Sequence, residues 1–308
     1  MNTQSNNTLE SAGATDPGYS ARTRPFYWSL KRELWENRSI YLVPLIVAVV
    51  YMFGFGISTV GLAGRRRGVL LLDLAKQRAG IEAPYDIVAV IMIFIAFVVG
   101  VFYCLDALHG ERRDRSILFW KSLPVSDVTT VLSKLTVPLV ILPLVAFAVI
   151  VVTQLIMLII TSVVLIAHGM SPATTWEHVP FFRNWITLVY ALIAVVLWQA
   201  PIYGWALLVS GWVRRATFLW AALPPLAIAI FEKITFNTSY VGALLKDRVF
   251  GFAPKAFEFH SHSSIAVNSL IQLTPGRYLS TPAFWIGLLF ATAFVFAAVR
   301  LRRYRGPL

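Results

Sequence analysis

The segment HGERRDRSILFWKSLPV, residues 109–125, stands between two long apolar runs. It places charged side chains directly beside large apolar ones, where water or lipid headgroups are expected. Arg and aromatic residues are enriched where proteins meet, which favours a docking surface for a partner protein. The alternative is an interfacial helix that extends its Arg side chains to water and buries Phe119 and Trp120 among the headgroups.

The composition around this segment is that of a membrane protein. Of 308 residues, 57% are hydrophobic and 14% are charged, and the mean hydropathy is +0.69, which excludes the soluble globular class. The net charge of +12 comes from Arg and Lys at the ends of apolar runs, a pattern typical of membrane topology and not of nucleic-acid binding. The single cysteine, Cys104, cannot form an intrachain disulfide, so we expect it to be a packing residue.

Six apolar runs are predicted to cross the membrane, because a bilayer core of about 30 Å requires about 20 helical residues. They are residues 39–60, 86–108, 135–167, 185–213, 216–231 and 282–299. The third is predicted to be one long helix, tilted or projecting beyond the bilayer and bent at its start by Pro138 and Pro143. The fifth carries Pro224 and Pro225, so its hydrogen-bond ladder must be broken, which is tolerated only against other helices or a cavity.

Two segments before the first span differ in character. Residues 1–24 are polar and have no apolar core, which predicts a disordered tail and excludes a signal peptide. In residues 25–38, Phe26, Leu30 and Leu34 recur every fourth residue and the charges occupy the remaining arc. This periodicity predicts an amphipathic helix that lies flat on the membrane.

The segment 232–281 is too long for a plain connection. Its moderately apolar pieces predict short outer re-entrant helices that dip into the membrane, and the alternative is a small exposed cap. The predicted fold is therefore an all-α polytopic membrane protein. Its residues 39–308 form a six-helix transmembrane domain, preceded by the amphipathic interfacial helix.

The distribution of Lys and Arg predicts that both termini are cytoplasmic. With the N-terminus inside, the inner segments hold 16 of the 27 basic residues, although the outer segments are longer in total. Cytoplasmic loops carry the excess of Lys and Arg in membrane proteins. The cluster Arg65, Arg66 and Arg67 disagrees, since it would lie outside.

The chain lacks the motifs of an enzyme or an ion-coupled carrier. It has no G-x-x-x-x-G-K-[ST] phosphate loop and no H-E-x-x-H zinc motif, and His260 and His262 have no third metal ligand beside them. No carboxylate, Lys or His lies at mid-depth of the six predicted spans, where proton or ion carriers need them. We therefore expect no catalytic residue, no metal site and no cofactor in this chain.

Neutral polar side chains do occur inside the spans. Thr153 and Gln154 lie in the third span, and Gln199 and Tyr203 lie in the fourth. Hydrogen bonding between helices is the first interpretation, because buried amides and hydroxyls commonly bond across helices. The second is a path for an amphiphile, which Pro201 would favour by freeing a backbone carbonyl.

These features together resemble the ABC-2 type permeases, the membrane subunits of a class of ABC transporters. The resemblance covers nearly the whole chain after residue 24 and depends on the six spans, the flat helix before them, and the sequences ERRDRSILFWKSLPVS at 111–126 and TTVLSK at 129–134. Glu111, the turn 123–126 and Lys134 correspond to an acidic residue, a turn and a lysine that recur in that family. The cluster Arg65 to Arg67 and the overlong third span have no counterpart.

The resemblance implies specific roles. Residues 111–125 would be the coupling helix that docks on a separate ABC ATP-binding subunit, 25–38 the connecting helix, and 232–281 the outer re-entrant pair. The expected docking residues are Glu111, Arg112, Arg113, Arg115, Ile117, Phe119, Trp120 and Lys121. The expected partners are that ATPase, which binds ATP and Mg, a second permease copy in a homodimer or paralogous heterodimer, and membrane lipid.

The expected function is the permease subunit of an ATP-driven exporter in a bacterial inner membrane. A non-transporting membrane-remodelling or sensory subunit partnered with an ATPase is the alternative. An intramembrane lipid-modifying enzyme is disfavoured because acid, base and metal groups are missing. The neutral, aromatic-rich spans favour an amphiphile, a drug or a lipid-like cargo over a free ion.

Overall fold

The computed structural model describes residues 24–305, apart from residues 70, 123–124, 179–180 and 258–272. Within this part the chain is helical, with an isolated β-bridge between Phe257 and Leu273 and no strand. The helices are α1 Pro25–Glu36, α2 Ser39–Ser58, α3 Leu62–Val69, α4 Leu74–Ala107, α5 His109–Arg113, α6 Ser116–Ser122, α7 Asp127–Thr136, α8 Leu142–Ala167, α9 Ala173–His178, α10 Phe181–Trp212, α11 Thr217–Phe236, α12 Tyr240–Phe250, α13 Ala253–Ala256, α14 Pro275–Ser280 and α15 Pro282–Tyr304.

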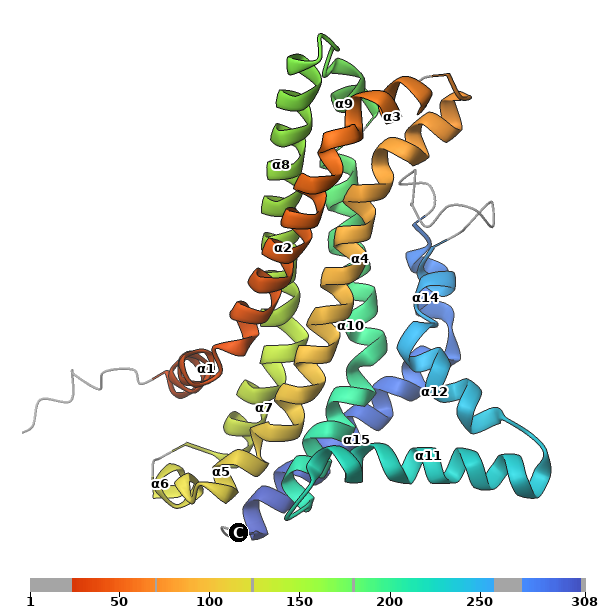
Figure 1. The fold of residues 1–308 in the computed structure, drawn as a ribbon. Coiled ribbons are helices and arrows are strands. Elements are labelled where there is room, and N and C mark those ends of the chain that lie inside the picture. Colours follow the sequence, from red (N-terminus) through yellow and green to blue (C-terminus); the bar gives the residue numbers. More distant parts are fainter. Residues whose placement is uncertain (1–23, 70, 123–124, 179–180, 258–272, 306–308) are drawn as a thin grey trace, which may run out of the picture.

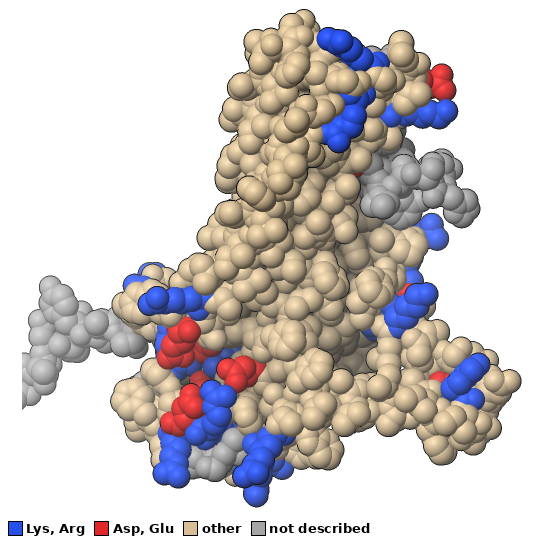
Figure 2. Space-filling view, viewed as in Figure 1, with Lys and Arg blue, Asp and Glu red and all other residues tan. Residues whose placement is uncertain are grey.

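Six stretches of the described chain are long and apolar enough to cross a membrane, which confirms the prediction of an all-α membrane protein. They are Ser39–Val69, Lys76–Arg113, Asp127–Ala167, Phe182–Trp212, Thr217–Phe236 and Pro282–Tyr304. The second begins ten residues before the predicted start at 86, because Ile81 and Tyr85 are buried and keep the first polar turns packed as helix. Figure 2 shows basic side chains at both ends of the molecule and, between them, a wide region in which charged side chains are few.

Four long helices, α2, α4, α8 and α10, form the body of the bundle (Figure 1). Helix α4 contacts the other three, and α15 packs along α10. The core contains the fully buried side chains of Met92, Ile150 and Leu207. At Gly204 a Cβ atom would lie 3.1 Å from the carbonyl oxygen of Ala291, so the close approach of α10 and α15 depends on this small residue.

The third span is one long helical rod, as predicted. Helices α7 and α8 are joined by the π-helical turn Val137–Ile141, so the chain continues without a loop. The wide turn contains Pro138, whose ring removes one backbone donor and disfavours the regular α-helical ladder. The predicted irregularity at the start of this span is therefore a local widening of the helix.

Helix α11 continues through Pro224 and Pro225 although both lack a backbone N–H group. The carbonyl of Ala221, which Pro225 leaves without its helical donor, accepts a hydrogen bond of 3.0 Å from the indole N–H of Trp205 on α10. This contact is the compensation by another helix that the sequence required. Beyond it, α11 runs across the axis of the other long helices (Figure 1), and none of its residues is buried.

The predicted outer segment 232–281 contains the end of α11 and the short helices α12, α13 and α14. The carboxylate of Glu232 accepts hydrogen bonds of 2.7 Å from the backbone N–H groups of Tyr240 and Val241, which caps α12 and turns the chain back. Re-entry of these helices into the membrane stays a prediction, and His260 and His262 lie outside the described residues.

The two ends of the described chain lie toward the same end of the bundle. Helix α1 and the end of α15 are both on the side of α5 and α6 (Figure 1). This arrangement agrees with termini on one side of a membrane, and their cytoplasmic location stays a prediction. The predicted disordered tail, apart from Arg24, lies outside the described residues.

The basic cluster after the first span is built into the opposite end of the bundle. Arg66 on α3 is buried and donates a hydrogen bond of 2.7 Å to the hydroxyl of Thr175 on α9. Arg65 donates to the backbone carbonyl of Ser58 at the end of α2. Arg65 and Arg66, two of the three residues that disagreed with the predicted topology, therefore hold neighbouring segments together.

Candidate functional site

The segment that follows α4 and precedes α7 is a hairpin of two short helices, α5 and α6, called here the α5–α6 hairpin. The prediction of one helix over 111–125 is wrong, because the chain breaks at Asp114 and Arg115. Arg115 has φ 57°, in the left-handed region that ends a right-handed helix. Residues 123–124 of the predicted helix lie outside the described chain.

Six charged side chains from four helices meet at the base of this hairpin, and we call them the charge cluster. They are Arg32 and Glu33 on α1, Glu111 on α5, Asp127 and Lys134 on α7, and Arg302 on α15. Glu111 lies at the centre, with its carboxylate 3.0 Å from Arg32, 3.1 Å from Lys134 and 3.3 Å from Arg302. One carboxylate of the hairpin is therefore ion-paired to three other helices.

Glu33 provides the second centre of the cluster and is completely buried. Its carboxylate accepts hydrogen bonds from Lys134 at 2.8 Å, from Arg32 at 2.6 Å and from the hydroxyl of Tyr103 at 2.8 Å. Burial raises the pKa of Glu33, but the charges of Lys134 and Arg32 outweigh it and hold that pKa below its ordinary value. The carboxylate is therefore ionised in the folded protein.

The cluster as a whole is neutral, since its three cations face three carboxylates. Arg302 pairs with Asp127 as well as with Glu111, which joins α15 to α7. A buried ion-pair network of this kind is stable only while every member is present, because removing one partner leaves an uncompensated charge. The helices that carry these groups are therefore held in one relative position.

The local sequence of α7 explains how two members reach the cluster. Ser126 caps the helix by accepting a hydrogen bond of 3.0 Å from the backbone N–H of Thr129. Asp127, Val131 and Lys134 then recur at intervals of four and three residues, which places them on one face of the helix. Val131 and Lys134 are buried on this face, and Asp127 lies at its edge.

Three of the predicted docking residues point into the protein. Ile117 is 1% exposed, and Glu111 belongs to the charge cluster. Arg112 is 5% exposed and donates a hydrogen bond of 2.9 Å to the backbone carbonyl of Gly211 on α10. In this conformation these three side chains fasten the hairpin to the bundle and do not lie on the surface that a partner would meet.

The other predicted docking residues lie at the outer edge of the hairpin. Arg113, Arg115 and Phe119 are exposed, and the Phe119 side chain is 60% accessible. Trp120 stacks edge-on with Phe119 at 4.9 Å and covers the guanidinium of Arg32 at 3.9 Å from its ring centroid. The outer edge therefore combines an exposed aromatic ring with two exposed cations, of which Arg113 is ion-paired to Asp114 at 3.0 Å.

Lys121 connects the same edge to the end of the chain. Its ammonium donates to the backbone carbonyls of Arg303 and Arg305 at 3.3 and 3.4 Å. Helix α6 is therefore held to α15 by Lys121 and to α1 by Trp120. Any displacement of this helix acts on both neighbours.

The predicted pathway residues on α8 make hydrogen bonds within the bundle. Gln154 donates to the backbone carbonyl of Tyr85 on α4 at 3.0 Å and accepts from the indole N–H of Trp185 on α10 at 3.3 Å. Thr153 donates to the carbonyl of Val149 in its own helix. The interhelical role expected for buried amides is confirmed for Gln154.

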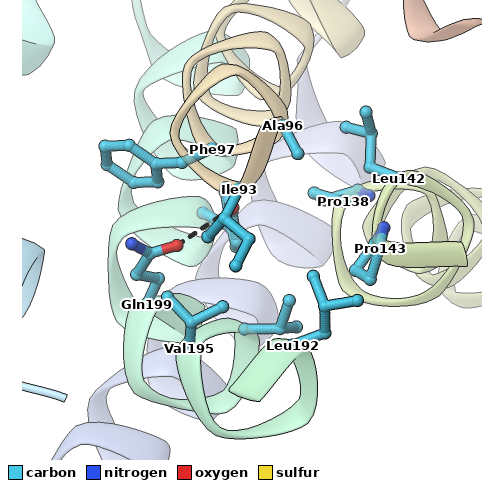
Figure 3. Close-up of a pocket in the computed structure, with 11 residues that line it drawn as sticks. Ile93, Ala96, Phe97, Pro138, Leu142, Pro143, Leu192, Val195 and Gln199 are labelled. Atoms are coloured by element: carbon cyan, nitrogen blue, oxygen red, sulfur yellow. Dashed lines mark hydrogen bonds between the residues drawn. The ribbon is translucent and has the colours of Figure 1, made fainter. Parts of the chain in front are cut away.

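Gln199 and Tyr203 lie apart from that pair, at a small pocket between α4, α8 and α10 (Figure 3). The Tyr203 hydroxyl donates to Gln199 at 3.4 Å, and the rest of the lining is apolar. The ring of Tyr203 packs directly against Gly100, where a Cβ atom would lie 2.9 Å from it. The four predicted pathway residues thus form two separate sites in this conformation.

Sequence reasoning missed four members of the charge cluster, Arg32, Glu33, Asp127 and Arg302. The charges of residues 25–38 were assigned to the outer arc of the helix, and this is wrong for Glu33. A signal was present, since Glu33 is seven residues after Phe26 and three after Leu30 and therefore shares their face. For Arg302, nothing in the local sequence distinguishes it from the neighbouring arginines.

The charge cluster joins α1, α5, α7 and α15 through ion pairs. The hairpin beside it has an exposed aromatic and basic edge. No family model, no curated protein and no solved structure matches this chain.

Proposed function

We propose that this chain is the membrane subunit of an ATP-driven exporter of the ABC-2 type, located in a bacterial inner membrane. In this proposal the α5–α6 hairpin docks a separate ATP-binding subunit, and a second permease copy completes the assembly. The observation that carries the proposal is the position of Glu111, which links the hairpin to α1, α7 and α15 within 3.3 Å. The resemblance of residues 111–134 to the family supports it.

The mechanism follows from the rigidity of the charge cluster. When the partner ATPases bind ATP and close, they push on the outer edge of the hairpin. The hairpin cannot slide past α7 or α15 without separating Glu111 from Lys134 and Arg302, which would leave buried charges unpaired at a cost of about 3–5 kcal/mol. The long helices therefore move with the hairpin as rigid bodies, which is a common form of switching between two states.

The chemistry of the outer edge defines the kind of groove it fits. Phe119 and Leu118 are 60% and 59% exposed and would enter an apolar pocket of the partner. Arg113 and Arg115 flank them and would meet acidic side chains at the rim, which orients the docking. ATP and Mg are assigned to the partner because the sequence of this chain has no phosphate-binding loop.

The first test is co-purification of the ATP-binding subunit with a Phe119→Ala variant. Phe119 contacts the partner in this proposal and makes no ion pair, so the variant should fold normally and recover about tenfold less ATPase. The matched control is Phe182→Ala, because this ring at the start of α10 is 79% exposed and lies at the opposite end of the bundle. Equal recovery of the ATPase with both variants would refute the docking surface.

A second measurement separates export from other roles of a partnered membrane subunit. The complex is reconstituted in proteoliposomes, and movement of an amphiphilic cargo is followed after addition of ATP. ATP-dependent movement that stops in the Phe119→Ala variant is the expected result. An intact complex that hydrolyses ATP and moves no cargo would favour a membrane-remodelling or sensory subunit.

A further inference from the structure

A second small core lies on the other side of the bundle, where α12, α13 and α14 pack against α10 and α15. It contains the buried side chains of Trp198, Phe257, Tyr278 and Phe284. Trp198 is near the middle of α10 and has no exposed surface. Charged groups beside the middle of a membrane-spanning helix often mark a functional site in membrane proteins.

Two cations lie against the ring of Trp198. The guanidinium of Arg248 is 4.6 Å from the ring centroid, and the ammonium of Lys255 is 4.1 Å from it. Asp247 is the one carboxylate that the described residues place beside them, 2.6 Å from Lys255. The group formed by Arg248, Lys255 and Asp247, called here the Trp198 clamp, therefore carries one positive charge in excess.

Arg248 is the cation without a carboxylate partner among the described residues. Its Nη2 group donates to the backbone carbonyl of Ala283. Its Nη1 group is buried and has no hydrogen-bond partner among the described residues. Burial lowers the pKa of Arg248, and the charge of Asp247 offsets this only in part. The guanidinium thus retains a donor for an anion.

The surroundings of Arg248 hold the guanidinium in place. A Cβ atom at Gly287 would lie 2.5 Å from both terminal nitrogens, so the guanidinium rests directly on the backbone of α15. Ala283 belongs to the first turn of that helix, whose free N–H groups add positive potential. The donor is therefore oriented by structure and lies in a positive field.

We propose that the Trp198 clamp binds the phosphate headgroup of an anionic amphiphile. Guanidinium groups match phosphate oxygens in charge and geometry, and an unpaired cation in apolar surroundings is stabilised by such an anion. Leu244 and Phe250 on α12 are each 61% exposed and offer an apolar surface next to the clamp for the acyl chain. This binding needs no ATPase, so it is independent of the proposed export function.

Native mass spectrometry of the purified full chain tests the proposal. The protein is titrated with phosphatidylglycerol and, separately, with phosphatidylcholine of the same acyl chains. The expected result is one phosphatidylglycerol bound more tightly than any phosphatidylcholine. Arg248→Gln should weaken that binding about tenfold or more, the ratio expected for the loss of a charge-assisted hydrogen bond.

Lys246→Gln is the matched control, because it removes the same charge from an exposed position of the same helix. Lys255→Gln serves as a second variant should Arg248→Gln fail to fold, since Lys255 is partly exposed. Displacement of the lipid by inorganic phosphate alone, at equal affinity, would assign the site to the free anion and overturn the lipid assignment. Equal binding by wild type and both clamp variants, or an equal loss in Lys246→Gln, would overturn the site itself.

Discussion

The replacement Lys134→Met measures how strongly the charge cluster holds the helices together. Lys134 is 2.8 Å from Glu33 and 3.1 Å from Glu111. Coulomb's law with an effective dielectric constant of about 20 gives roughly 6 and 5 kcal/mol of attraction at these distances. Desolvation of a buried ammonium cancels much of this attraction, so we expect a loss of about 3–5 kcal/mol in the free energy of unfolding. Methionine fills a similar volume, which limits the contribution of packing.

The loss is measured by equilibrium unfolding in mixed micelles, followed by far-UV circular dichroism. A double-mutant cycle with Glu111→Gln isolates the pair, because the double variant removes one charge of each sign. Its destabilisation should be smaller than the sum of the two single losses by about 1–3 kcal/mol.

The control is Lys246→Met at an exposed position of α12, away from the charge cluster, where we expect a change within about 0.5 kcal/mol. A loss below about 1 kcal/mol in Lys134→Met, or one equal to the control, would contradict the view that these ion pairs hold the hairpin. In the assembled complex, Lys134→Met leaves the docking edge of the hairpin unchanged. ATPase recovery should therefore be normal while ATP-driven transport falls.

Three further predictions follow from individual contacts. The folded-state pKa of Glu33 lies below its ordinary value of 4.5, so its stabilisation is complete above that value and is lost as the pH falls through the lower pKa. Glu33→Gln should therefore flatten the acid limb of a plot of unfolding free energy against pH, and an unchanged limb would refute this. Gly100→Ala places a Cβ atom 2.9 Å from the ring of Tyr203. The variant should lose about 1–3 kcal/mol of unfolding free energy and melt at a lower temperature. An unchanged melting temperature would show that the ring has room to move. Trp205→Phe removes the donor to the Ala221 carbonyl, so amide hydrogen exchange should rise in α11 and stay constant in α8; equal exchange in both helices would contradict this compensation.

The apolar spans were accessible to sequence reasoning because each depends on a local property. A run of about 20 apolar residues is stable in lipid whatever its neighbours are, so composition alone predicts the helix. The order of the six spans and the single long third span follow in the same way. The start of α4 was predicted too late in the sequence. Its first turns are polar, and the packing of Ile81 and Tyr85 stabilises them as helix.

Contacts between helices that are distant in the sequence show a second limit of local reasoning. The two prolines of α11 required a compensating contact, but only the fold identifies Trp205 as the donor. Likewise, the basic residues after the first span contradicted the predicted topology. Arg66 is held by Thr175, which lies 109 residues further along the chain, so its role depends on the packing of α3 and α9.

The sequence by itself determined that this chain is an all-helical membrane protein with a charged, aromatic segment between its second and third spans, because hydropathy and periodicity act over a few neighbouring residues. Only the tertiary structure decided which charges of that segment turn inward. Glu33 and Lys134 are 101 residues apart, and their pairing depends on how α1 and α7 pack against each other. A buried charge is stable only beside its partner, and the partner is defined by the packing of helices and not by the order of residues.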